Sequence, residues 1–77
     1  MIAAPRQERE VWIDYTNYKG ERRWRLVRPM NVWFGTSAWH HGTQWFLHAD
    51  DVEKGQVRDF EMASIHVWTR SGETPEM

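Results

Sequence analysis

Short segments of alternating apolar and polar residues constrain the fold of this chain more than any other feature of its sequence. Residues 11–15 alternate with a period of two, and the turn-forming residues 17–20 follow them. Alternation of this kind is typical of β-strands with one buried face. Alternation recurs in residues 22–28, 30–34 and 65–69, and residues 44–48 and 57–60 are further short strand-like segments bounded by turn residues. The sequence therefore predicts an all-β fold of five to six short antiparallel strands.

Helix has little support in this sequence. Residues 61–64 would make about one turn, which predicts a 3-10 segment before the last strand. Pro29 lacks an amide donor, so it fits a strand end or a sheet edge. Short strands at this spacing favour closure into a small barrel, because closure removes exposed edges. We expect one barrel domain over residues 9–70, with flexible tails at residues 1–8 and 71–77.

Composition narrows the class of protein further. The chain has 77 residues, six of them Trp, and no Cys. It can form one small domain but no disulfide, thiolate site, zinc ribbon or iron–sulfur cluster. The aromatic content argues against disorder, and most of the Trp side chains are predicted to lie in the core or to plug the ends of the barrel. The net charge of −1 argues against a protein that coats nucleic acid electrostatically.

Charged residues are distributed unevenly along the chain. Residues 19–28 are rich in Arg, whereas residues 50–61 are mainly acidic. Arginine binds phosphate or carboxylate through two parallel hydrogen bonds and stacks on aromatic rings. The basic segment therefore predicts either a phosphate site or ion pairs with the acidic segment across the sheet. The sequence leaves both interpretations open.

The four histidines give no clear chemical site. His40, His41, His48 and His66 show no metal-ligand spacing, so no metal site is predicted. An enzyme that uses His48 or His66 would lack a nucleophile and a base arranged around it. We therefore expect no catalytic residues and no cofactor. Since no signal peptide or membrane-length apolar run is present, the cytoplasm is the expected compartment, with no membrane association.

Several short motifs follow one another in a recognisable order. They are Ile-Asp-Tyr at 13–15, Lys-Gly-Glu at 19–21, Arg-Leu-Val-Arg-Pro at 25–29, Trp-Phe-Leu at 45–47 with Ala-Asp-Asp at 49–51, and Arg-Asp-Phe at 58–60 followed by Ile65. In this order the chain resembles the WYL domain, a small Sm-like or SH3-like β-barrel of bacterial transcription regulators. The resemblance runs from about residue 13 to residue 67.

The resemblance implies a ligand-sensing module whose ligands are nucleic acids or nucleotides. It places Arg25, Phe46 and Arg58 at positions associated with the ligand site. Phe46 replaces the signature Tyr, which keeps the ring but loses the hydroxyl, and Ser64 stands where the family often has Arg. Strict alternation turns Phe46 outward, away from the face of Trp45 and Leu47. It also puts Arg58 on the face of Phe60, unless the strand bends or Arg58 lies at the barrel mouth.

These observations predict a non-enzymatic regulatory sensor that binds an anionic ligand, either a nucleotide or a short single-stranded nucleic acid. No helix-turn-helix precedes the barrel, so a separate DNA-binding protein or a second copy is the expected partner. The alternative is an SH3-like interaction module that docks a peptide or extends a partner's sheet without binding nucleic acid. The predicted ligand-binding residues are Arg25 and Arg58 as a phosphate clamp, Phe46 as a stacking ring, Arg23 and Arg28 as additional positive charge, and His48 beside them.

Overall fold

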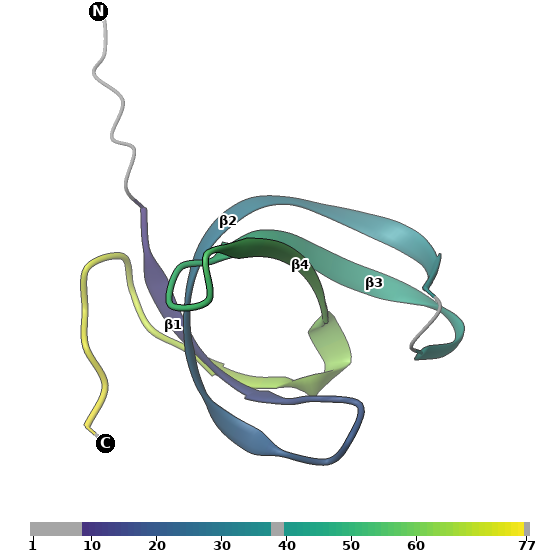
Figure 1. Ribbon diagram of the computed structural model, residues 1–77, viewed down its shortest axis with the longest axis horizontal. Helices are drawn as coiled ribbons and strands as arrows, with labels where there is room; N and C mark the ends of the chain where they lie inside the picture. Colours follow the sequence, from purple (N-terminus) through teal and green to yellow (C-terminus); the bar gives the residue numbers. More distant parts are fainter. Residues whose placement is uncertain (1–8, 38–39, 77) are drawn as a thin grey trace, which may run out of the picture.

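The computed structural model describes residues 9–37 and 40–76, which form a single antiparallel sheet. Its strands are β1 (Val11–Thr16), β2 (Arg22–Ser37), β3 (His40–Asp51), β4 (Gln56–Glu61) and β5 (Ile65–Trp68), with the 3-10 turn η1 (Met62–Ser64) before β5 (Figure 1). The strand order is β4-β3-β2-β1-β5. The predicted all-β class, the antiparallel strands and the 3-10 segment are confirmed. No helix in the described residues has the length and apolar character needed to cross a bilayer.

The turn between β1 and β2 shows how local chemistry sets the register. The Asn17 side-chain oxygen accepts hydrogen bonds from the amides of Lys19 and Glu21, both at 2.9 Å. Gly20 takes a φ of 86°, which side chains other than glycine adopt only at a cost. Asn and Gly favour such turns for these two reasons. The turn brings Thr16 opposite Arg22 in the ladder.

β2 is longer than the sequence pattern predicts. The separate strands expected at 22–28 and 30–34 are one strand of 16 residues. The ladder with β3 shifts between Pro29 and Asn31, so a bulge there absorbs the irregularity that the pattern presents as a strand end. The ladder between β1 and β2 ends at Val27. Pro29 therefore lies where β2 has one neighbouring strand, as its missing amide requires.

The sheet curls strongly, so that β4 and β5 approach each other around a ring (Figure 1). The turn η1 connects the two strands, but within residues 9–37 and 40–76 no ladder pairs them. Complete closure of the predicted barrel is therefore not confirmed.

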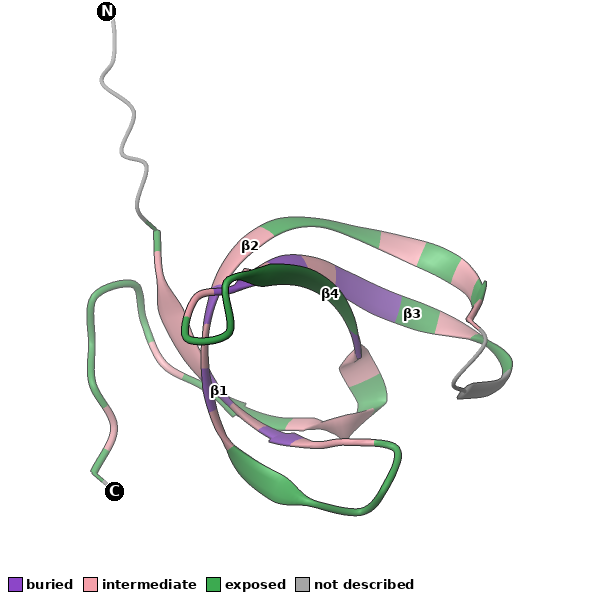
Figure 2. Ribbon diagram, in the orientation of Figure 1, coloured by how far each residue is buried: buried purple, intermediate pink, exposed green. Residues whose placement is uncertain are grey.

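The buried residues lie on β1 to β4, around the ring of strands (Figure 2), and alternation assigns the core to the inner face of the curled sheet. The core consists of Ile13, Tyr15, Val27, Leu47, Ala49 and Phe60. None of the five Trp residues within the described chain belongs to the buried set, so the part of the prediction that assigned them to the core was wrong. Trp39 lies outside the described residues. Trp12, Trp24 and Trp33 alternate with inner-face residues and are half-buried on the outer face, whereas Trp45 lies on the inner face beyond the core.

Candidate ligand-binding site

A cavity of about 420 Å³ opens at one end of the inner face. Strands β1, β2 and β4 supply most of its walls. The lining residues are Tyr15, Asn17, Tyr18, Arg25, Ser37, Gln56, Val57, Arg58, Asp59 and Phe60. Arg25 and Arg58 come from distant parts of the chain. The curvature of the sheet is what brings them to the same cavity.

Arg25 lies in the floor of this cavity as a buried cation. It alternates with Trp24 and Leu26, so it shares the inner face with Val27, and its side chain is only 6% exposed. Its Nη1 donates a hydrogen bond to Oδ2 of Asp51 at 3.2 Å, and Asp51 is itself 1% exposed. The Arg25 Nε is buried without a hydrogen-bond partner in the described chain. A buried guanidinium needs such partners, because desolvation of a charge is costly.

Arg58 is the exposed cation at the entrance of the cavity. It pairs with Ala49 in the β3–β4 ladder, which places it on the inner face, where strict alternation predicts it. Its Nε and Nη2 both donate to Oε1 of Gln56, at 3.1 and 3.0 Å. No ion pair with a carboxylate is recorded for Arg58 in the described residues. Its positive charge is therefore available to an anion.

Two tyrosines complete the cavity wall. Burial raises the pKa of Tyr15, while the positive charges of Arg25 and Arg58 act in the opposite direction. The Tyr15 hydroxyl accepts a hydrogen bond from the Glu61 amide at 3.1 Å. Tyr18 is 57% exposed and presents a ring beside the entrance. Tyr15, with its raised pKa, stays neutral near pH 7 and can donate its hydroxyl proton.

Phe46 is placed differently from its predicted role. Alternation correctly puts it on the face opposite Leu47, but the ring is fully buried and stacks on Trp33 with centroids 4.7 Å apart and planes at 25°. The prediction of an outward, accessible ring was therefore wrong. Trp45, which alternation places on the face of Leu47, is 54% exposed. Phe46 is buried because the β2–β3 register sets Trp33 directly opposite it, so that the two rings stack.

His48 also lies on the outer face. Its Nδ1 lies 2.8 Å from Oδ1 of Asp59, and that oxygen accepts a second hydrogen bond from the Trp33 indole at 2.8 Å. His48 is not among the residues that line the cavity. No group of three or more His, Asp or Glu in the described residues could hold a metal ion.

The other predicted arginines do not line the cavity. Arg28 donates to Glu10 at 2.6 Å and to Asp50 at 3.2 Å. Arg23 is exposed and lies opposite Tyr15, a cavity residue, in the β1–β2 ladder.

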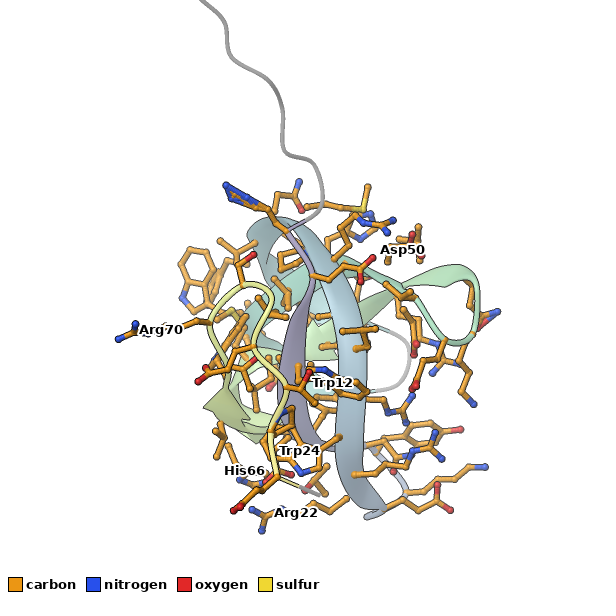
Figure 3. All side chains as sticks on the ribbon, turned by 90° about the vertical axis from the view of Figure 1, so that its left-hand side faces the viewer. Trp12, Arg22, Trp24, Asp50, His66 and Arg70 are labelled. Atoms are coloured by element: carbon orange, nitrogen blue, oxygen red, sulfur yellow. The ribbon has the colours of Figure 1, made fainter. Side chains whose placement is uncertain are left out.

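On the other side of the sheet, Arg22 lies near Trp24 and His66 (Figure 3). It pairs with Asp14, and the shorter of its contacts is 2.8 Å.

The sequence left open whether the arginines bind phosphate or pair with the acidic segment across the sheet. Arg25 and Arg28 do pair with that segment, through Asp51 and Asp50. Arg58 has no such carboxylate partner among the residues described.

The structure thus brings together two of the predicted residues, Arg25 and Arg58, and separates them from the rest. Sequence reasoning did not single out Tyr15, Tyr18 or Gln56 as cavity residues. The available signal was alternation: Tyr15 shares the parity of Ile13, and Gln56 that of Arg58. Alternation does not indicate at which end of the inner face the cavity lies.

A family model gives an independent comparison. The WYL domain model matches residues 1–70. Comparisons with curated proteins and with solved structures give no match. The family match spans most of the chain. The chain therefore belongs to the WYL domain family, the non-catalytic ligand-sensing domains of bacterial regulators.

Proposed function

We propose that this domain senses a nucleotide or a short single-stranded nucleic acid by binding it in the cavity at the open end of the sheet. The observation that carries the proposal is the convergence of Arg25 and Arg58 on one cavity. Arg58 binds the phosphate directly, because no carboxylate neutralises it in the described chain. Arg25 stays bonded to Asp51 and contributes its remaining guanidinium donors.

In this proposal a base of the ligand stacks on Tyr18 and not on Phe46. Tyr18 lines the cavity and is more than half exposed, whereas Phe46 is covered by Trp33. An aromatic ring beside a cationic groove is a common platform for single-stranded bases, and each stacked base contributes about 1–3 kcal/mol. The cavity volume of about 420 Å³ suits one nucleotide unit, so a longer strand would run out across the rim near Arg23.

Isothermal titration calorimetry with a nucleoside monophosphate and with an oligothymidylate of about six nucleotides tests the proposal. A charge-assisted hydrogen bond contributes about 1.5–3 kcal/mol, so we expect Arg58→Ala to weaken binding by about 10- to 150-fold. Arg70→Ala is the matched control, because Arg70 is also exposed but does not line the cavity.

Salt dependence gives the second readout of the same experiment. Binding to phosphate weakens as salt rises, and removal of one contacting cation reduces that slope. Absence of heat with either ligand, or equal affinities for the Arg58→Ala and Arg70→Ala variants, would show that the cavity is not the nucleotide site.

A further inference from the structure

The outer half of β2 has an open edge. β1 pairs with β2 only as far as Val27, while β2 continues to Ser37 against β3 alone. Within residues 9–37 and 40–76, no strand pairs with the other side of residues 29–36. The β2–β3 hairpin projects beyond the ring of strands (Figure 1). A strand edge of this kind is a template for pairing with another extended chain.

The same hairpin carries an apolar surface. Val32 pairs with Leu47, and Phe34 with Trp45, so their side chains share the face that forms the core elsewhere. Among the residues that the structure describes, nothing covers this face here: Val32 is 50%, Phe34 56% and Trp45 54% exposed. The two aromatic rings lie 5.1 Å apart. An uncovered apolar patch beside an open strand edge is typical of an interaction surface.

Charge indicates which partner fits this edge. Residues 29–47 contain no Asp, Glu, Lys or Arg, although 27% of the whole chain is charged. Sheet edges that avoid association are normally protected by charges, and this one is not. A segment without charge meets a second copy of itself without electrostatic repulsion. It also offers no charge by which a peptide of opposite sign could be selected.

We propose that two copies of this chain pair antiparallel through residues 30–36 of β2, about a two-fold axis at Trp33. This register sets Val32 opposite Phe34 of the second copy, and Asn31 opposite Gly35 of the second copy. Apolar side chains then face each other on the same side of the paired strands in both halves of the dimer, as a symmetric interface requires. Seven residues span about 23 Å of strand. The interface is smaller than the standard of about 800 Å² per partner, so the dimer is weak, with a dissociation constant in the micromolar range.

Sedimentation velocity of the full chain, from about 1 to about 300 µM, tests the dimer. We expect a concentration-dependent shift from the monomer to twice its mass. Val32→Lys places a charge opposite the apolar Phe34 of the second copy and diagonal to the same charge there, so it should raise the dissociation constant at least tenfold. Val67→Lys is the matched control, because Val67 is similarly exposed, at 45%, but lies on β5, the edge strand at one end of the sheet, and does not line the cavity; this variant should dimerise like the wild type.

Two further readouts separate this interface from other forms of association. Amide hydrogen exchange in residues 30–36 should slow as protein concentration rises, while exchange in β4 stays unchanged. Because the interface carries no charge, dimerisation should not weaken with salt, in contrast to phosphate binding. A wild-type monomer at all concentrations, assembly beyond a dimer, equal effects of the two Lys variants, or loss of the dimer in salt would overturn the proposal.

Discussion

The buried ion pair between Arg25 and Asp51 is a sensitive point of the fold, and Asp51→Asn perturbs it with little change of shape. The substitution keeps an oxygen that can accept from the Lys54 amide, as Asp51 Oδ1 does at 3.3 Å. It removes the charge that neutralises a guanidinium only 6% exposed, whose Nε already has no partner in the described chain. Loss of one partner from a buried pair costs about 3–5 kcal/mol.

That cost is large for so small a domain. A typical stability of 0.05–0.15 kcal/mol per residue gives this chain about 4–12 kcal/mol in total. With a urea m-value of about 1–1.5 kcal/mol/M, the unfolding midpoint should fall by roughly 2–5 M. The assay is urea unfolding followed by Trp fluorescence. A common background of sucrose keeps the weaker variants folded.

A double-mutant cycle decides whether the charge pair is the cause. Arg25→Met alone leaves the Asp51 carboxylate buried, whereas Arg25→Met with Asp51→Asn removes both charges. We expect the double variant to cost at least about 2 kcal/mol less than the two single costs together. The exposed Arg22–Asp14 pair is the control, and its single costs should be nearly additive. Additive costs for Arg25 and Asp51, or a single cost below about 1 kcal/mol, would refute the reasoning.

Three further predictions concern the backbone and a surface ion pair. A Cβ at Gly35 would lie 2.7 Å from the Trp33 ring, so Gly35→Ala should cost about 1–3 kcal/mol in urea unfolding and alter the near-UV circular dichroism of the indole; an unchanged spectrum would contradict this. Gly55 has a φ of 68°, so Gly55→Ala should lower stability by about 1–2 kcal/mol, measured in the same way; equal stability would show that the turn relaxes. The hydrogen bond from Arg22 lowers the pKa of Asp14, so this carboxylate stabilises the fold above its unfolded pKa and loses that effect as pH falls through the folded one. Unfolding titrations between about pH 6 and pH 2 should show a smaller acid-side loss for Asp14→Asn than for the wild type; parallel curves would exclude the linkage.

The strands were predictable from sequence because alternation and turn chemistry are local. The Asn17 and Gly20 turn and the 3-10 segment before Ile65 needed no knowledge of distant residues. The continuity of β2 through Pro29 was not predictable in the same way. A bulge that accommodates a proline depends on the ladder with β3, and pairing between distant strands leaves no local pattern.

The site was predictable only in part, for a related reason. Alternation places Arg25 and Arg58 on the inner face, but the curvature of the sheet decides that both reach one cavity. The predicted exposure of Phe46 was wrong because the ring of Trp33, which belongs to a different strand, covers it. Parity assigns a side chain to a face of the sheet, and the residues of neighbouring strands then determine whether it meets solvent.

The absence of a ladder between β4 and β5 in the described chain has a mechanical consequence. The two strands can separate without breaking a main-chain hydrogen bond between them, since η1 connects them and Tyr15 accepts only from the Glu61 amide nearby. Arg58 lies on β4, beside the gap between the two strands. Outward movement of β4 would therefore widen the cavity that Arg58 lines. Such a movement would cost side-chain packing and the hydrogen bond from the Glu61 amide to Tyr15, but no ladder between β4 and β5 in the described chain.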